Sequence, residues 1–456
     1  MRVTRDLATF AATIRFDQLP DDVVATVKVA TLNIIACCLG GARTRLGRLH
    51  VDLARLIGGG LPEATILGAG ERASVPAGVY ANASLAFVLD YEDMIRYVAH
   101  PGHATVAAAL GVGEDLHSSG HDYLAAVAAG YEVCSRIALA VQPTPERGAE
   151  VWGEQYHTFA AAAAAGRLLG LDPEQMEVAF GIAGAYTTVP SAYKYFGPVF
   201  ETRPMREVKL GWGWNSLAGV AAALAAKQGF SGGHGVLDGR HGFWIMHGSD
   251  RCDFERMVEG LGEEWLTRET EFKIHPSIGI NHPAYWATKL LVDEHDLHPE
   301  DVEHIRVTTL WADRIDDPTP YGEVAAQFSL PYTIAATILR EPLGPGLYSQ
   351  QKRDDPALLR LLARVEVVAD GEADRLFFEE QRLRQTVAIA LADGRLLQRQ
   401  IEFPRDKPQY GKPEVEQKFE DLAEGLLDAA RRASVRAAID RLETVDDVNE
   451  LIAFLR

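Results

Sequence analysis

The sequence predicts a mainly α-helical protein, in which a large all-α domain is followed by a smaller α+β domain. The chain has 456 residues, which is more than one hydrophobic core usually organises. Segments within the first 265 residues are alanine-rich and apolar on most faces, which is typical of buried helices. Beyond about residue 270, alternating apolar runs indicate strands. We therefore expect an all-α domain over 1–268, an α+β domain over 269–408 and a helical segment over 409–456 that returns to the first domain.

Three long helices are expected in the first domain. One begins in PDDVVATVKVATLNIIACCLGGA (20–42), where a proline and two aspartates favour a helix start and paired glycines favour its end. The other two lie in DYLAAVAAGYEVCSRIALAVQ (122–142) and YHTFAAAAAAGRLLGLD (156–172). Their small residues permit close helix packing. No alternation of strands and helices appears here, which disfavours a doubly wound nucleotide-binding fold.

Strands and helices are both expected in the second domain. Strands are predicted in HIRVTTLWA (304–312), LARVEVVAD (362–370) and RQTVAIALADGRLLQRQIEFP (384–404). In the last of these, Asp393-Gly394 separates two alternating runs, which is a strong hairpin signal. Helices are predicted in NHPAYWATKLLVDEH (281–295) and SLPYTIAATILRE (329–341). Proline and charge in FPRDKPQYGKPE (403–414) mark the return to the first domain.

Bulk composition narrows the possible partners and the cellular location. With 45 basic and 64 acidic residues the formal charge is −19, and no basic stripe suggests nucleic-acid binding. The four cysteines show no CxxC spacing, and a bridge between the adjacent Cys37 and Cys38 would be strained, so we expect reduced thiols in a cytoplasmic protein. The N-terminus does not look like a signal peptide. No run of 18 or so apolar residues was identified, so no membrane span is expected.

Two histidine–proline pairs each precede a predicted helix. They are His100-Pro101, in the acidic stretch LDYEDMIRYVAHPGHATVAAALGVGEDL (89–116), and His282-Pro283. Proline keeps the preceding residue extended and fits the first helical turn. Each histidine should then lie beside unpaired backbone N–H groups at the positive end of a helix, a suitable seat for a carboxylate. The alternative is that both histidines only cap their helices.

Four further residues stand out by their surroundings. His157 lies at the polar start of a very apolar helix, where a histidine satisfied within the core is the alternative. Lys209 and Lys273 have apolar or aromatic neighbours, so each either extends to solvent or pairs with an acid. Tyr332 begins a predicted helix and could simply pack there.

Motifs of several common enzyme classes are absent. The sequence has no GxSxG, HExxH or GxxxxGK[ST] motif, and no GxGxxG follows a strand. The two carboxylates Asp90 and Asp93 and the imidazole of His100 could bind a divalent metal. No further ligand at a suitable spacing supports such a site. We therefore expect neither a metal nor an organic cofactor.

Several motifs in a fixed order resemble the MmgE/PrpD family, which includes 2-methylcitrate dehydratase, cis-aconitate decarboxylase and iminodisuccinate epimerase. They are LDYEDM…HPG, AAVAAGYEVCSRI, YHTFAAAAAAGRLLGL, GVAAALAAKQGFSGGHGVLDGRHGF, KIHPSIGINHPA and FSLPYTIAATIL. The resemblance implies a large all-α domain with an α+β lid, a homodimer, and a site in the cleft between the domains. It also implies the catalytic positions Asp90, His100, His157, Lys273 and Tyr332. We expect substrate contacts from Lys209, Arg203, His282 and Trp212.

The resemblance also implies the chemistry, which is proton movement next to a carboxylate without metal or cofactor. We expect a lyase, either a dehydratase or a decarboxylase, acting on a di- or tricarboxylate-like small molecule. The alternatives are a dicarboxylate epimerase and a specialised or inactive family member. His157 is the leading acid/base candidate and His100 a second proton carrier.

Supporting roles are expected for the remaining catalytic candidates. Asp90 would orient His100 and keep it protonated. Lys273 and Lys209 would bind carboxylates or stabilise charge, and Tyr332 would donate to a leaving group. Glu92, Asp93 and His103 are expected to be structural.

Three positions depart from the family pattern. Met94 stands where the cis-aconitate decarboxylases have a threonine, Ile278 replaces a histidine, and Gly211 replaces another. These departures predict a pocket for a substrate less hydrophilic than cis-aconitate.

Overall fold

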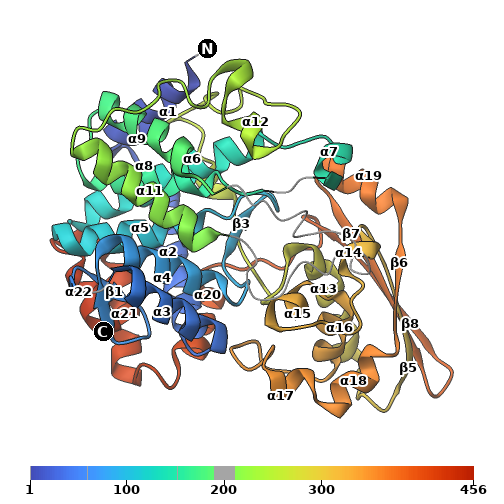
Figure 1. Ribbon diagram of the computed structural model, residues 1–456. Coiled ribbons are helices and arrows are strands. Elements are labelled where there is room, and N and C mark those ends of the chain that lie inside the picture. The colour runs from blue at the N-terminus through green and yellow to red at the C-terminus, as the bar shows by residue number, and fades with distance from the viewer. Residues whose placement is uncertain (1, 59, 151–152, 189–210) are drawn as a thin grey trace.

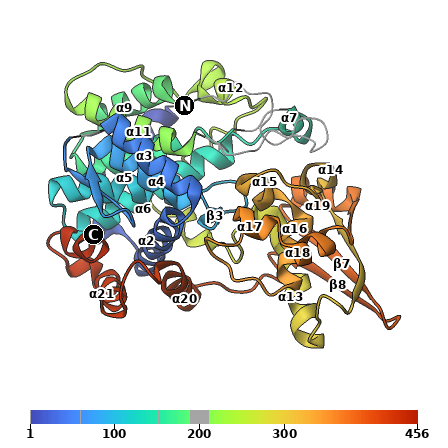
Figure 2. The ribbon, with the colours of Figure 1, turned by 60° about the horizontal axis from the view of Figure 1, so that its bottom comes forward.

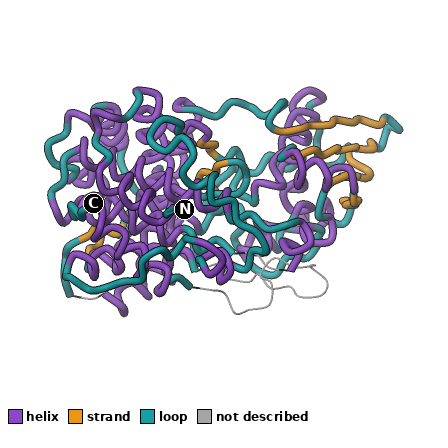
Figure 3. The backbone as a smooth tube through the Cα atoms, turned by 90° about the horizontal axis from the view of Figure 1, so that it is seen from above, coloured by secondary structure: helices purple, strands orange, loops and turns teal. Residues whose placement is uncertain are grey.

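The computed structural model describes residues 2–58, 60–150, 153–188 and 211–456, and it is mainly helical (Figure 1). Helices from the N-terminal and C-terminal parts of the chain gather on one side, and a four-stranded sheet with its own helices lies on the other. Seen from above, the longest strands lie at the far edge of the molecule (Figure 3).

The described helices of the first part are α1 (Val3–Thr13), α2 (Asp21–Ala42), α3 (Arg45–Gly58), α4 (Val75–Phe87), α5 (Pro101–Leu116), α6 (Gly120–Ala140), α7 (Pro145–Glu150), α8 (His157–Leu168), α9 (Pro173–Tyr186), α11 (Trp212–Lys227) and α12 (Phe243–His247). Those that follow are α13 (His282–His295), α14 (Ala312–Ile315), α15 (Glu323–Phe328), α16 (Leu330–Ile338), α17 (Gln350–Arg353), α18 (Pro356–Leu362) and α19 (Gly371–Glu380). The C-terminal helices are α20 (Lys412–Ala423), α21 (Ala429–Asp440) and α22 (Asn449–Ile452).

The first hydrophobic core is built around α8, which packs against α5, α6 and α11. Its run of alanines lets neighbouring backbones come close. At Gly219 of α11, an added Cβ would lie 2.3 Å from the carbonyl oxygen of Thr158, so glycine is required at this helix contact. Apolar residues of α20–α22 belong to the same core, and these helices lie beside the N-terminal ones (Figure 2). The C-terminal helices therefore share one core with the N-terminal ones.

The second hydrophobic core lies under a sheet with strand order β6-β5-β7-β8. Its strands are β5 (Val302–Thr309), β6 (Val365–Ala369), β7 (Leu383–Leu391) and β8 (Leu396–Phe403). Strands β5 and β6 are parallel and the other pairs are antiparallel. The predicted hairpin joins β7 to β8, where Gly394 has φ 89°. Along β7 every second residue is buried, against α13 on the inner face.

The chain passes from the first core to the second between Phe272 and Ile274. It returns to the first core between Phe403 and Val415. These points lie close to the expected limits at 268/269 and 408/409, which stay a prediction as domain boundaries. Two side chains from the first part of the chain, Leu46 and Val88, also belong to the second core.

The first part of the chain contains short strands that were not predicted. Strand β1 (Ala64–Ile66) pairs with β2 (Glu71–Ala73), and β3 (Asp93–Ile95) pairs with β4 (Thr270–Phe272). Three residues are too few to show an alternating pattern, which is why the sequence did not reveal them.

The expectation that no helix could span a membrane was also wrong by length and composition. Helices α2 and α6 both qualify, with mean hydropathies of 1.9 and 1.2. In the fold, 78% and 100% of their apolar windows are buried, so both serve as core helices here.

Candidate active site

A short antiparallel pairing brings together two segments that lie about 180 residues apart. In β3 and β4, Asp93 lies opposite Phe272 and Met94 opposite Glu271. Continuing this register by one residue places Glu92 opposite Lys273, and the Lys273 N–H donates to the Glu92 carbonyl oxygen over 3.2 Å. Because side chains alternate along a strand, a one-residue slip would turn the lysine to the other face.

Lys273 forms the centre of a buried ion cluster. Its Nζ donates to Asp90 Oδ1 and, over 2.9 Å, to Glu92 Oε1. The side chains of Lys273, Asp90 and Glu92 are 1%, 2% and 0% exposed. Burial opposes the charge on Lys273, but the two carboxylates outweigh it and raise the pKa of Lys273 above its ordinary value. The lysine is therefore held as an ammonium ion.

The position of Asp90 requires an uncommon backbone conformation. Its φ is 52°, in the left-handed region that aspartate tolerates better than most residues. Such conformations gather at functional sites, where the surrounding structure holds them in place. The tight turn after α4 thereby turns the carboxylate toward Lys273.

His100 contacts Glu92 and Asp93, and its orientation by Asp90 stays a prediction. The Nδ1 atom of His100 lies 3.1 Å from Glu92 Oε1 and 3.1 Å from the carbonyl oxygen of Asp93. The Asp93 carbonyl can only accept a hydrogen bond, so Nδ1 carries the proton, and the His100 ring lines the cavity described below. Glu92 therefore contacts both Lys273 and His100, and the structural role expected of it stays a prediction.

Asp93 anchors the start of α5. It accepts hydrogen bonds from the Tyr131 hydroxyl and, over 3.1 Å, from the Gly102 N–H. An added Cβ at Gly102 would lie 2.4 Å from the Asp93 carboxylate, so only glycine fits. Burial raises the pKa of Asp93 to about 6, against the lowering effect of the Tyr131 hydroxyl. These contacts agree with the structural role expected of Asp93.

Three histidines gather around the indole of Trp212. The ring centroids of His103, His157 and His100 lie 4.6, 5.2 and 5.7 Å from that of Trp212, and the His103 and His157 centroids are 4.4 Å apart. Burial lowers the pKa of His103 to about 3. Burial, together with His103, lowers the pKa of His157 well below its ordinary value. Both imidazoles are therefore neutral.

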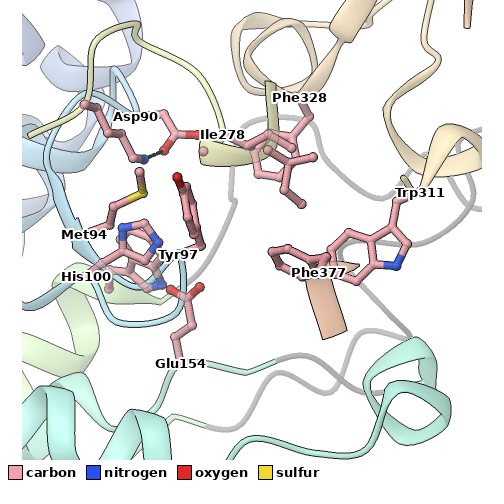
Figure 4. A pocket seen from close by; sticks show the side chains of 13 residues that line it. Asp90, Met94, Tyr97, His100, Glu154, Ile278, Trp311, Phe328 and Phe377 are labelled. Atoms are coloured by element: carbon pink, nitrogen blue, oxygen red, sulfur yellow. Dashed lines mark hydrogen bonds and ion pairs between the residues drawn. The ribbon is translucent and has the colours of Figure 1, made fainter. Parts of the chain in front are cut away.

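Asp90, His100 and Lys273 lie at one end of a cavity that encloses about 580 Å³, counting the solvent at its mouth. The ionisable residues that line it are Asp90, His100, Glu154 and Lys273. Its other lining residues are Met94, Tyr97, Trp212, Ile278, Gly279, Ile280, Trp311, Phe328 and Phe377. Figure 4 shows Asp90, Met94 and His100 on one side of the space and Trp311, Phe328 and Phe377 across from them.

Several predicted site residues lie away from this cavity. His157 is fully buried and does not line it. Tyr332 lines a different hollow, and its hydroxyl donates to the Leu347 carbonyl over 2.6 Å. His282 is buried, with Nε2 3.3 Å from the Ser277 carbonyl, and burial together with Lys273 lowers its pKa. Neither Tyr332 nor His282 therefore lines this cavity.

Other site residues were missed, or fall outside the described part of the chain. Lys209 and Arg203 lie outside the described residues. Glu154 was missed, although it lies three residues before His157, and no pattern pointed to Trp311 or Phe377. Within the described ranges, no group of three or more His, Cys, Asp or Glu side chains is placed to hold a metal ion.

The class of protein is a mainly helical one with two hydrophobic cores. A cluster of acids, a lysine and a histidine lies between these cores. Comparison with known families agrees with this description. The MmgE/PrpD N-terminal domain matches residues 5–254 and the MmgE/PrpD C-terminal domain matches residues 275–444. The chain therefore belongs to the MmgE/PrpD family.

Among curated proteins, the chain is similar to fungal relatives along its whole length. It is 24% identical to the cis-aconitate decarboxylase-like protein oryM of Aspergillus oryzae, over 99% of this chain and 97% of that protein. It is also 24% identical to a cis-aconitate decarboxylase of Aspergillus terreus, over 99% of this chain and 96% of the relative.

Proposed function

We propose that the protein is a lyase that moves a proton next to a carboxylate of its substrate, without a metal or an organic cofactor. The observation that carries this proposal is the buried ammonium of Lys273, held beside His100 at one end of a cavity. The names of the two fungal relatives, both of the cis-aconitate decarboxylase kind, support a lyase and favour loss of CO2 over loss of water.

Lys273 is proposed to bind a substrate carboxylate. An ammonium group has three N–H donors, of which two go to Asp90 and Glu92. The third is then available to a carboxylate in the cavity. The same donor would stabilise the negative charge that develops when the neighbouring carbon becomes an enediolate, because a preorganised charge acts strongly where water is excluded.

His100 is proposed to carry the proton. With Nδ1–H bonded to the Asp93 carbonyl and lying beside Glu92, its Nε2 can remove a proton from carbon or, once protonated, deliver one. In a decarboxylation, the C–C bond to the leaving carboxylate breaks and CO2 departs. The electron pair remains on carbon, and the carbon then takes the proton from Nε2. In a dehydration, Nε2 takes the proton from carbon and passes it to the departing hydroxyl group, which leaves as water while the carbon–carbon double bond forms.

The second candidate is an epimerase, and Glu154 is the observation that favours it. Epimerisation needs a proton donor and acceptor on each face of one carbon, and Glu154 lines the same cavity as His100. His157, the expected second base, does not line the cavity. A homodimer and a cytoplasmic location remain predictions.

Proton NMR in D2O tests the proposal with citrate-like, aconitate-like and amino-dicarboxylate substrates. Loss of CO2 or water from one of them is the expected result, and deuterium exchange without elimination would favour the epimerase. His100→Asn should lower kcat about 10²- to 10⁴-fold, the range for a lost proton carrier. Tyr332→Phe is the matched control, because this hydroxyl bonds elsewhere. Unchanged turnover in His100→Asn would refute the assignment.

A further inference from the structure

We infer that the substrate of this site is an amphipathic acid, with one or two carboxylates at one end and an alkyl or aryl substituent at the other. The substituent would pack against Trp311, Phe328 and Phe377. This inference rests on the proposed function for the position of the carboxylate, and it adds the class of molecule that the rest of the cavity accepts.

The cavity is divided into a small ionic end and a large apolar remainder. Asp90, His100 and Lys273 lie together at the ionic end, whereas Trp311 and Phe377 lie across the space (Figure 4). A carboxylate placed against the Phe328 and Phe377 rings would lose its hydration without gaining a hydrogen-bond donor from them. An apolar group placed there would instead be stabilised, because its transfer out of water is favourable.

The wall between the two ends carries apolar side chains as well as the Tyr97 ring. Met94 and Ile278 both line the cavity with apolar side chains. A Cβ added to Gly279 would lie 3.0 Å from the Met94 sulfur, so the methionine packs directly over this glycine. The wall therefore leaves no room at that point for the waters that would accompany a further carboxylate.

Charge at the ionic end also limits the number of carboxylates. Lys273 already contacts two buried acids, Asp90 and Glu92, and Glu154 is a further acid on the cavity wall. Among the described lining residues, the only other group that can become positive is His100. This set of charges does not favour a trianion.

The aromatic part of the cavity is held together by its own contacts. The centroids of Trp311 and Phe377 are 5.7 Å apart, and the Arg314 guanidinium lies 4.8 Å from the Trp311 ring centroid. A wall that is already packed binds an apolar group without having to be ordered first. Each methylene buried there should tighten binding about fourfold.

Isothermal titration calorimetry on the full chain tests the inference with unreactive saturated acids. The series is succinate and its 2-ethyl, 2-butyl and 2-hexyl derivatives, with tricarballylate as the tricarboxylate. We expect Kd to fall about fourfold per methylene up to the length that fills the cavity. 2-Butylsuccinate should bind at least tenfold more tightly than tricarballylate.

Phe377→Ala should remove most of the gain along the alkyl series and leave the affinity for succinate unchanged. Phe378→Ala is the matched control, because Phe378 also packs on Trp311, with centroids 5.4 Å apart, but does not line the cavity. Melting temperatures of both variants show that they are folded. Met94→Thr combined with Ile278→His should weaken hexylsuccinate and tighten tricarballylate.

Equal affinity along the series, tighter binding of tricarballylate, or no binding of any member would overturn the inference. These outcomes are separate from a failure of the proposed function, because the ligands do not react. Turnover of an unsubstituted tricarboxylate, with no alkyl preference, would retain the lyase and refute the apolar substituent. Alkyl-dependent binding without any turnover would retain the apolar substituent and refute the lyase.

Discussion

Replacing Lys273 with methionine should destabilise the protein severely. Lys273 is 1% exposed and contacts Asp90 and Glu92, which are 2% and 0% exposed. Methionine fills a similar volume, so the effect comes from charge and not from a new cavity. Removing one partner of a buried ion pair costs about 3–5 kcal/mol of unfolding free energy, because the remaining charge is left buried without compensation.

The destabilisation should grow with pH. In the wild type, the raised pKa of Lys273 means that its stabilisation is fully present below the unfolded lysine pKa of about 10.4, so it is constant from pH 5 to pH 8. In the variant, at least one of the two buried acids retains a proton that the unfolded chain releases above about pH 4. The free energy lost relative to wild type should therefore be larger at pH 8 than at pH 5.

Urea unfolding at pH 5 and pH 8 measures this loss. Circular dichroism and tryptophan fluorescence should both be followed, since coincident transitions justify a single free energy. Adding Asp90→Asn and Glu92→Gln to the variant should recover at least half of the loss, because the uncompensated charges are removed. Lys289→Met, which breaks an exposed pair with Asp293, should cost no more than about 0.5 kcal/mol.

The reasoning would be refuted by either of two results. A loss below about 1 kcal/mol at both pH values would mean that water reaches the cluster and screens it. A loss that shrinks as pH rises would mean that the two carboxylates are not the source of the penalty.

Three further predictions concern other parts of the molecule. Burial lowers the pKa of His103 and His275 to about 3, so the unfolded chain binds protons that the folded state excludes below pH 6.5. Unfolding curves between pH 6.5 and pH 5 should show stability falling as the pH drops, with a slope that rises toward about 1.4 kcal/mol per histidine per pH unit near pH 5. Tyr332→Phe removes the bond to the Leu347 carbonyl and should cost about 1 kcal/mol in urea unfolding, with kcat unchanged. Gly41→Ala places a Cβ 2.1 Å from a carbonyl oxygen of α4 and should cost more than about 2 kcal/mol, seen as a lower melting temperature.

Much of the fold could be predicted because its signals are local. The Asp393-Gly394 turn between alternating strands predicted the β7–β8 hairpin, which is confirmed. Lys273 was expected either to extend to solvent or to pair with an acid, because lysine is rarely buried alone, and the structure shows the pairing. Each of these features depends on residues close together in the sequence or on the chemistry of one side chain.

The arrangement of the site could not be predicted, because it depends on contacts between distant segments. The register that places Glu92 opposite Lys273 comes from two strands of three residues each, too short to leave a periodic pattern. For the same reason Asp90 was expected as the partner of His100. The aromatic wall of Trp311 and Phe377 comes from two separate segments of the second core, and neither residue lies in a recognisable motif.

On the proposed mechanism, the buried cluster places an opposite charge beside each group that changes charge during the reaction. Asp90 and Glu92 contribute two negative charges and Lys273 one positive charge, so the three together are left with one negative charge. His100 meets this excess through Glu92 Oε1, the same atom that accepts from Lys273. When Nε2 takes a proton from carbon, the imidazolium brings the four groups to neutrality, in a place where an unbalanced charge is costly. The same proton transfer places negative charge on the substrate next to Lys273, so both products of the step meet an opposite charge.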